Sequence, residues 1–363
     1  MPVSILLLSG ASLVGQNIVQ ALARRNQGLR LVATNSLPSD PGLADFDSVV
    51  LVPPTRSESE KFDQIIEQLI DREKPALTIP CRDDDVLALA RLAIRRPDLA
   101  PKLLCGSLET AGATIDKWAS WEFSQKWDLP FVPTILPDKI EAVDRFAQEQ
   151  GFPLLAKPRL GFASRGVSII QNREQLAAIT GDHSILLQRY LGSSVAIADY
   201  IETIRTAGIP LFHSFESTKY SFQALISRDG KIIDKFATEH HMSQGISQRV
   251  SRCDDADGLA LGMKCASAFA EAGWRGPINI QCQRTPDGKL FIYEFNGRFT
   301  GATAARMLLG YDEVSIALQH YSGIVLSRAP KRTESFVLKQ PVSRTMPHEI
   351  QYSLETVGVW PPV

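Results

Sequence analysis

The chain has 363 residues, enough for two or three packed domains around a substantial core. Hydrophobic residues make up 44% of the chain and charged residues 22%, as in an ordinary soluble globular protein, and no apolar run approaches the ~18 residues of a membrane span. The formal net charge of -1 excludes an overall field that would attract nucleic acid or a membrane surface.

The first third of the chain alternates short apolar runs with helix-compatible segments. Apolar runs predict strands at residues 3–8, 29–33, 48–52 and 75–80, and the segments between them predict helices at residues 14–25, 58–73 and 83–95. Strands that alternate with helices predict a parallel sheet with helices on both faces. We therefore expect an α/β, Rossmann-like domain over residues 1–113.

A pair of glycines, Gly10 and Gly15, lies between the first predicted strand and the first predicted helix. A dinucleotide phosphate would rest on helix N–H groups at such a place. However, the fingerprint has two glycines rather than three, and Ala33-Thr34-Asn35 stands where an acidic residue is expected about 20 positions later. A structural glycine turn is at least as good an interpretation, so an NAD-linked oxidoreductase ranks last among the functions considered.

The second part of the chain follows an α+β pattern. Asp-Gly turns at residues 229–230 and 287–288 each separate two strand candidates and predict antiparallel hairpins, and residues 256–273 predict a long helix between them. The segment 327–363 is predicted to be an extended tail, because prolines recur along it. These are Pro330, Pro341, Pro347, Pro361 and Pro362.

The segment Leu154 to Val167 ends a predicted strand in Lys157 and continues in a loop with Gly161, Ser164 and Gly166. Backbone N–H groups of such a loop can reach phosphate oxygens, and Lys157 supplies a point charge beside them. An ordinary hairpin with a solvated lysine accounts for the same pattern, so this loop alone is only modestly specific.

Two later strands carry polar side chains at alternate positions. Glu294 and Asn296 share one face of their strand, and Gln281 can face them if the two strands pair through the Asp-Gly turn. Carboxylate and amide oxygens are hard ligands that suit Mg²⁺ bridging nucleotide phosphates. Arg298 projects from the same face and could stabilise phosphoryl charge. A polar edge strand is the alternative, but it would not require this series inside so apolar a run.

The order of these motifs resembles the ATP-grasp superfamily, most closely the units of the carbamoyl phosphate synthase large chain and similar single-unit carboxylate-amine ligases. The resemblance runs from about residue 3 to residue 325 and is strong only when its motifs are taken together. Its motifs are Thr78 to Asp85, Asp116-Lys117-Trp118, the Lys157 loop, Leu186 to Leu191, Gly276 to Gln281 and Glu294 to Arg298.

The resemblance implies a site residue by residue. ATP phosphates would be bound by Lys117, Lys157 and the closing loop with Ser164, Arg165 and Gly166. Adenine would contact Gln188, Arg189, Tyr190 and Leu191. Mg²⁺ or Mn²⁺ would be held by Gln281, Glu294 and Asn296. Arg298 would face the transferring phosphoryl group or the substrate carboxylate, and catalysis by positioning and charge neutralisation would need no catalytic triad.

The resemblance also implies domains and an activity. Residues 1–113 would form the domain that precedes the ATP-grasp fold, residues 114–191 the lid with the phosphate loop, residues 192–326 the lobe with the metal site, and residues 327–363 the tail. The expected enzyme is an ADP-forming ligase that phosphorylates a carboxylate and couples the acyl phosphate to an amine. A bicarbonate- or carbamate-phosphorylating unit ranks second, and a non-catalytic nucleotide-binding module is the remaining alternative.

Three features depart from the family's pattern. Extra residues, about Gly192 to Phe215, follow the adenine segment and are interpreted as a lid or a substrate-selecting element. Lys219-Tyr220-Ser221 stands where a ribose-binding glutamate is expected, and Glu216 or Glu202 could replace that residue. Finally, Gly297 stands where the family usually has proline.

Arg249 follows Gly245 in a segment that resembles a phosphate- or substrate-facing loop, so we include it among the catalytic candidates. The adjacent pair His240-His241 is a poor zinc site, because neighbouring residues point apart on an extended chain. Small-molecule carboxylates and amines are the expected partners, without nucleic acid or membrane, and a homodimer is left open. Five scattered cysteines without a CxxC pair, and an N-terminus without the basic start of a signal peptide, predict a cytoplasmic protein.

Overall fold

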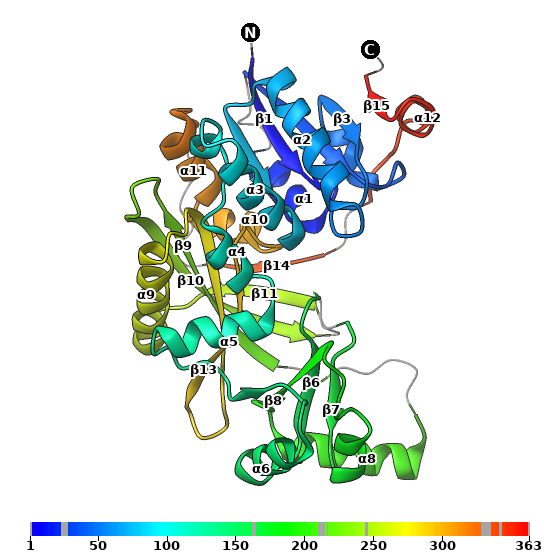
Figure 1. Ribbon diagram of the computed structural model, residues 1–363, viewed down its shortest axis with the longest axis vertical. Helices are drawn as coiled ribbons and strands as arrows, with labels where there is room; N and C mark the ends of the chain where they lie inside the picture. The colour runs from blue at the N-terminus through cyan, green and yellow to red at the C-terminus, as the bar shows by residue number, and fades with distance from the viewer. Residues whose placement is uncertain are drawn as a thin grey trace.

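The computed structural model describes residues 2–22, 28–161, 165–209, 215, 217–243, 246–327, 335–340 and 343–361. These residues form a mixed α/β structure with three sheets, which follow one another along the long axis of the molecule in Figure 1. None of the helices in the described ranges combines the length and the apolar character that crossing a membrane requires.

The first sheet contains the N-terminal strands. Its strands are β1 (Val3–Leu8), β2 (Leu29–Asn35), β3 (Ser48–Leu51), β4 (Leu77–Pro80) and β15 (Val359–Trp360), in the order β15-β3-β2-β1-β4. The helices along this stretch are α1 (Leu13–Leu22), α2 (Ser59–Glu73) and α3 (Asp83–Arg95), with 3-10 turns η1 (Pro41–Asp45) and η2 (Ala100–Lys102). Strands β1 to β4 are parallel and β15 is antiparallel.

Both faces of the first sheet are buried. Side chains alternate across a strand, so Ile5 and Leu7 of β1 pack with α1 on one face while Leu6 and Leu8 pack with α2 and α3 on the other. A parallel sheet covered on both faces is why these strands read as continuous apolar runs in the sequence.

The smallest sheet lies at the opposite end of the molecule (Figure 1). Its strands are β5 (Thr134–Ile135), β6 (Leu154–Pro158), β7 (Ser168–Ile170) and β8 (Ile185–Arg189), in the order β5-β8-β6-β7. Two helices belong to this part, α6 (Ile140–Gln150) and α7 (Arg173–Ala177). Apolar side chains of α6 and α7 pack against one face of this sheet, on which Leu154 and Leu187 lie. The other face carries Lys157 and Gln188, because these residues stand at alternate positions of paired strands.

The six-stranded sheet occupies the middle of the molecule. Its strands are β9 (Ser217–Ile226), β10 (Ile232–Ser243), β11 (Ile246–Arg252), β12 (Gly276–Arg284), β13 (Leu290–Asn296) and β14 (Phe336–Leu338), in the order β13-β12-β9-β10-β11-β14. The pairs β9–β10 and β12–β13 are antiparallel, which confirms the two hairpins predicted from their Asp-Gly turns.

One face of the six-stranded sheet is covered by α9 (Ala256–Glu271), the long helix predicted at 256–273. Phe222 of β9 lies so close to this helix that a Cβ on Gly262 would meet its ring at 2.1 Å. Glycine at this position therefore allows the close approach of helix and sheet. The preceding helices α4 (Leu108–Ala113) and α5 (Lys117–Lys126) contribute Ala111, Ala113 and Phe123 to the same core.

The helices α10 (Thr303–Leu308) and α11 (Glu313–Ser322) return to the first sheet. Val314 and Leu318 of α11 share a core with Ile5 and Leu7 of β1, and Tyr311 joins the same cluster. The residues after β13 therefore connect the six-stranded sheet to the N-terminal sheet.

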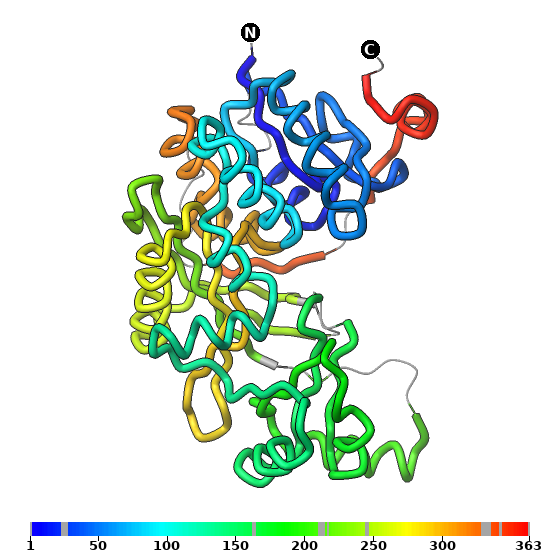
Figure 2. The backbone as a smooth tube through the Cα atoms, in the orientation of Figure 1, coloured from blue at the N-terminus to red at the C-terminus, as the bar shows by residue number. Residues whose placement is uncertain are grey.

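The prolines predicted an extended tail. The structure differs, because the tail contains helix α12 (His348–Thr356) and the strands β14 and β15. Pro347 stands at the N-cap of α12, where a proline is tolerated, and Ile350 and Leu354 supply an apolar side that packs into the core of the first sheet. Figure 2 shows the orange to red tail passing beside the six-stranded sheet before it returns to the first one.

The predicted insertion at about 192–215 contains helix α8 (Ser194–Ala207), which projects at the small-sheet end of the molecule (Figure 1). Ser193 caps its N-terminus by accepting a hydrogen bond from the Ala196 backbone N–H. Ile197 is the one residue of this helix that is buried.

Candidate active site

One face of the six-stranded sheet carries a row of polar side chains. Gln281 of β12 stands opposite Glu294 of β13 on one side and Ser221 of β9 on the other, and residues directly opposite each other share a face. The α9 helix covers the reverse face, where Phe222 and Ile280 are buried in its core. The polar row therefore marks the candidate site.

A β-bulge adds Tyr293 to this row. The register of β12 and β13 shifts between Gln281 and Cys282, so that Gln281 pairs with Glu294 and Cys282 pairs with Ile292. Tyr293 is the extra residue of the bulge, and bulges re-aim side chains. Its hydroxyl donates a hydrogen bond to Gln281 Oε1 at 2.8 Å, which turns its ring to the polar face.

The three predicted metal ligands lie together. Gln281 Nε2 donates to Asn296 Oδ1 at 2.6 Å, and Asn296 Nδ2 lies 3.4 Å from Glu294 Oε1. One carboxylate and two amides supply only oxygen ligands, which fits Mg²⁺ or Mn²⁺ that completes its shell with water and substrate phosphates. Across the described ranges, this site included, no group of three His, Cys, Asp or Glu side chains is placed to hold a metal ion.

Two lysines converge on Tyr293 from different sheets. Lys157 Nζ lies 5.5 Å from the ring centroid and comes from β6 of the small sheet, while Lys219 Nζ lies 5.3 Å from it and comes from β9. Burial lowers the pKa of Lys157 to about 7, with Glu294 opposing and Lys219 and Lys117 adding to the effect. Burial also lowers the pKa of Lys219, again opposed by Glu294.

Lys117 contacts the start of the predicted phosphate loop. It is the first residue of α5, and its Nζ donates to the Gly161 carbonyl at 3.1 Å. Asp116 caps the same helix and forms an ion pair with Arg159, at 2.5 Å between Oδ2 and Nη2. These contacts hold Arg159 and Gly161, at the start of the loop, against the N-terminus of α5.

The far end of the loop requires glycine. Gly166 has a φ of +73°, and a Cβ there would lie 2.9 Å from Pro158 Cγ. Its neighbour Arg165 is exposed. Ser164, the other predicted phosphate contact of this loop, lies outside the described residues, and so does Glu216, the predicted ribose contact.

The predicted adenine segment lies on β8 and just after it. Gln188 is 1% exposed and its Nε2 donates to Thr134 Oγ1 at 3.1 Å, so its side chain is engaged inside the small lobe. The Arg189 guanidinium lies 5.7 Å from the ring centroid of Phe291 on β13. This contact links the small sheet to the six-stranded sheet. Leu191 is buried in the core of the six-stranded sheet, and burial raises the pKa of Tyr190.

Arg298 follows strand β13 and is held by a carboxylate at the start of α3. Its Nε lies 2.7 Å from Asp83 Oδ1, and its Nη2 donates to Asp83 Oδ2 at 3.1 Å. Burial disfavours the charged guanidinium, but Asp83 keeps the pKa of Arg298 above its ordinary value.

Arg249 is not part of this cluster. From Ile246 on, the predicted loop is strand β11, in which Arg249 pairs with His241, one position away from the pair of His240 with Lys219. Alternation therefore directs Arg249 away from the face of Lys219. Its guanidinium lies 4.0 Å from the ring centroid of Phe336 in β14.

His240 and His241 point apart, as expected for neighbours on a strand. His240 is buried between two hydroxyls, with Nε2 2.9 Å from Thr238 Oγ1 and Nδ1 2.9 Å from Ser247 Oγ. Burial, with nearby Arg306, Lys339 and Lys219, lowers the pKa of His240 to about 3. It is therefore a neutral hydrogen-bonding residue on the polar face.

Sequence reasoning missed Lys219 and Tyr293 as site residues. In the sequence Lys219 stands out only as a departure from the family's pattern, and it is the pairing of Ser221 with Gln281 in the structure that places Lys219, two residues before Ser221, on the polar face. The sequence gives no sign that Tyr293 belongs to the site. Regular alternation along β13 would place it on the reverse face, and only the bulge brings it to the polar face.

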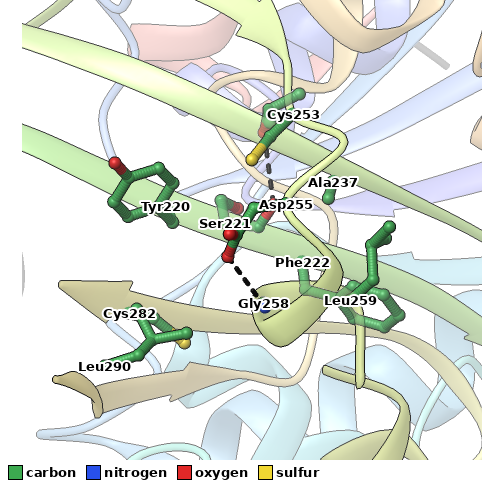
Figure 3. A pocket seen from close by; sticks show the side chains of 11 residues that line it. Tyr220, Ser221, Phe222, Ala237, Cys253, Asp255, Gly258, Leu259, Cys282 and Leu290 are labelled. Carbon is green, nitrogen blue, oxygen red and sulfur yellow. Dashed lines mark hydrogen bonds between the residues drawn. The ribbon is translucent and has the colours of Figure 1, made fainter. Parts of the chain in front are cut away.

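The pocket in Figure 3 is a different feature. Tyr220, Phe222, Cys253 and Leu259 line it, and it lies on the side of the sheet that α9 covers, where the Asp255 carboxylate accepts from the Gly258 N–H at 2.8 Å. Its lining is mostly apolar and includes none of the predicted site residues.

Comparison with known proteins gives relatives of low identity. No family model matches the chain. It is 26% identical over 165 residues to the carbamoyl phosphate synthase large chain of Bifidobacterium longum (strain DJO10A), an alignment that covers 43% of this chain and 14% of that protein. The chain thus matches a small part of that relative's length. It is 26% identical over 374 residues to the formate-dependent phosphoribosylglycinamide formyltransferase of Synechococcus sp. (strain RCC307), covering 94% of this chain and 89% of the other.

Among solved structures, the chain is similar to the biotin carboxylase domain of Hydrogenobacter thermophilus 2-oxoglutarate carboxylase, a dimer in complex with MgADP, ADP and bicarbonate. The TM-score is 0.64 at 17% identity, and the match covers 92% of this chain and 73% of the other. At this identity the likeness establishes a shared fold.

Proposed function

The chain has the ATP-grasp fold, and on that premise we propose that it is an ATP-dependent ligase that converts a carboxylate to an acyl phosphate and couples it to an amine. One observation carries this proposal. Lys157 from the small sheet and Lys219 from the large sheet meet at the ring of Tyr293, beside the trio Gln281, Glu294 and Asn296. Cations and oxygen ligands facing each other from two lobes suit a nucleotide triphosphate with a divalent metal.

We infer the following domains. Residues 1–113 form a Rossmann-like domain that precedes the ATP-grasp fold, and residues 114–191 form the lid with the phosphate loop. Residues 192–326 form the lobe with the metal site, although α10 and α11 share the core of the first sheet. Residues 327–363 form the tail, whose β14 extends the large sheet.

In the proposed reaction, Lys117 and Lys157 bind the phosphates of ATP, together with Arg165 and Gly166 at the end of the phosphate loop. The segment Gln188 to Leu191 contacts adenine, partly through backbone groups. Mg²⁺ or Mn²⁺, held by Gln281, Glu294 and Asn296, would neutralise phosphate charge when bound. Glu294 needs no proton transfer for this role, so the residues act by position and charge.

The substrate carboxylate attacks the γ-phosphorus of ATP, which forms the acyl phosphate and releases ADP. The amine nitrogen then attacks the acyl carbon, the C–N bond forms, and inorganic phosphate leaves. Arg298 follows Asn296 by two residues, and Asp83 holds its guanidinium. In the proposed reaction this guanidinium stabilises charge on the phosphoryl group or holds the carboxylate. Water must be excluded while the acyl phosphate exists, and closure of the two lobes serves this purpose.

A bicarbonate-phosphorylating activity is the second candidate. It is favoured by the likeness to a biotin carboxylase domain that was solved with bicarbonate and by the similarity to a carbamoyl phosphate synthase large chain. A non-catalytic nucleotide-binding module is the third candidate, because Lys219 stands where the resemblance implies a ribose-binding glutamate. Small-molecule substrates, a cytoplasmic location and a homodimer remain predictions.

The decisive experiment measures ATP-dependent phosphate release with Mg²⁺ across pools of amino acids, other carboxylates and bicarbonate. Release that requires a carboxylate together with an amine supports the ligase. Release with bicarbonate alone supports the second candidate. If ADP never forms in any pool although ATP binds, the proposal reduces to a nucleotide-binding module.

A further inference from the structure

We propose that Lys219 is a third lysine that binds the nucleotide phosphates and that the ring of Tyr293 positions it beside Lys157. This inference rests on the proposed function and deepens it. It assigns a role to a residue that stands where the resemblance led us to expect a carboxylate.

The sheet places Lys219 on the polar face. Ser221 stands opposite Gln281, and Lys219 lies two residues before Ser221 on the same strand. Side chains two residues apart share a face, so Lys219 and Gln281 project to the same side. His240, the partner of Lys219 on β10, projects there as well.

The ring of Tyr293 fixes where the lysine ends. Lys219 Nζ lies 5.3 Å from the ring centroid, and Lys157 Nζ lies 5.5 Å from the same point. Tyr293 is itself held by its hydrogen bond to Gln281, one of the proposed metal ligands. The two ammonium groups and the metal trio are therefore organised around one side chain.

The charges at this point are unbalanced. Glu294 is the carboxylate that acts on both lysines, and among the described carboxylates none forms an ion pair with either ammonium. Both lysines are half-buried, so they have lost part of their hydration, and a cation–π contact replaces only a fraction of it. An arrangement of this kind is favourable when an anion is bound between the lysines.

The anion that fits is a polyphosphate rather than a single carboxylate. Lys157 adjoins the phosphate loop, and Lys117 contacts the same loop through Gly161. Lys219 reaches the site from the other sheet, so a ligand that contacts all three lysines must extend between the lobes. A triphosphate carries several negative charges along its length and meets this requirement, whereas a carboxylate carries one.

The test compares ATP, ADP and AMP binding to the full-length protein by isothermal titration calorimetry. Lys219→Met removes the charge, Lys219→Arg retains it, and Lys157→Met removes the neighbouring charge. Lys235→Met on β10 is the matched control, because Lys235 is exposed and pairs with Ala224, away from the polar face. Thermal unfolding of each variant checks that it folds.

We expect Lys219→Met to weaken ATP binding by at least about tenfold, since hydrogen bonds to charged groups are the stronger ones. The loss should be smaller for ADP and smallest for AMP. Lys219→Arg should bind ATP within about threefold of the wild type, and Lys235→Met should be unchanged. Tyr293→Phe keeps the ring and should retain the ATP affinity that Lys219 contributes. Tyr293→Leu removes the ring and should lose most of that affinity.

Unchanged ATP affinity in Lys219→Met, with a loss in Lys157→Met, would overturn this inference and leave the proposed function standing. Equal losses for ATP, ADP and AMP, together with a lower Tm, would overturn it in favour of a structural role. Failure of the wild-type protein to bind ATP at all would overturn both the inference and the proposed function.

Discussion

Arg298 and Asp83 connect the end of strand β13 to the first turn of α3, across 215 positions of sequence. Their closest atoms, Nε and Oδ1, lie 2.7 Å apart, and the side chains are only 13% and 20% exposed. The guanidinium is thereby held at the boundary between the polar face and the first sheet. A charge that is already positioned there loses little entropy when substrate binds.

We predict that Asp83→Asn lowers both stability and turnover. Removing one partner of an ion pair leaves the other charge uncompensated, which is most costly when the pair is fully buried. Because this pair is partly exposed, we expect a loss of about 2 kcal/mol in the free energy of unfolding. Urea unfolding measures this change. The double variant Asp83→Asn with Arg298→Met should be less destabilised than the sum of the two single variants. Strictly additive losses would show that the two side chains are not coupled.

Glu294→Gln tests the metal trio. The substitution keeps the shape of the side chain and removes its charge, so the free energy of unfolding should change by less than about 1 kcal/mol. Mg²⁺-dependent turnover should fall by at least about a hundredfold, because the one carboxylate of the trio is lost.

Glu239→Gln provides the matched control for that variant. Glu239 is exposed on β10 and, by alternation with His240, faces away from the polar row. Its turnover should equal that of the wild type. Wild-type turnover in Glu294→Gln, measured across a Mg²⁺ titration, would instead remove Glu294 from the metal site.

Local sequence was enough to predict the hairpins and the trio. The Asp-Gly turns set β9–β10 and β12–β13, and alternation along β13 then placed Glu294 and Asn296 on one face. These features depend on residues that are close in sequence or joined by one short turn, where periodicity carries most of the information.

Features that depend on distant pairing could not be predicted. The bulge at Gln281/Cys282 re-aims Tyr293, and no residue type announces a bulge in advance. The ion pair of Arg298 with Asp83 requires the first sheet to dock at a known place. Arg249 faces away from the polar row because it lies on a strand rather than in a loop, and this strand pairs with β14 from the tail.

The pair Arg306 and Glu313 gives a stability prediction apart from catalysis. Arg306 Nη2 lies 2.6 Å from Glu313 Oε1, and the side chains are 0% and 1% exposed. Arg306→Met should cost roughly 3–5 kcal/mol in the free energy of unfolding, because it leaves Glu313 buried without its ion-pair partner. Urea denaturation checks the loss, and the double variant Arg306→Met with Glu313→Leu should recover part of it.

The exposed pair Arg205 and Glu202 on α8 is the control for this comparison. Their side chains are 72% and 58% exposed, so solvent screens the attraction. Arg205→Met should change the free energy of unfolding by no more than about 0.5 kcal/mol. If Arg306→Met lowered the free energy of unfolding by as little as Arg205→Met, the buried pair of Arg306 and Glu313 would not stabilise the protein more than the exposed pair does.

The lowered pKa of Lys157 predicts how ATP binding depends on pH. Burial lowers the pKa of this lysine to about 7, so it is largely neutral in the free protein above that pH. Phosphate favours the protonated form, and binding above pH 7 must therefore take up a proton. The affinity should fall by up to about tenfold for each pH unit above 7 and should lose this dependence below it. Titration calorimetry in buffers of different ionisation enthalpy measures both the affinity and the proton uptake.

Lys157→Arg separates charge from titration in that experiment. Arginine stays protonated across the range, so the variant should bind ATP without the proton uptake and with a flatter pH dependence. The comparison should be made between pH 7 and 9, where the wild-type lysine changes its charge. An ATP affinity of the wild type that is constant across that range would mean that Lys157 is already charged in the free protein. Its partial burial would then cost less than the pKa of about 7 implies.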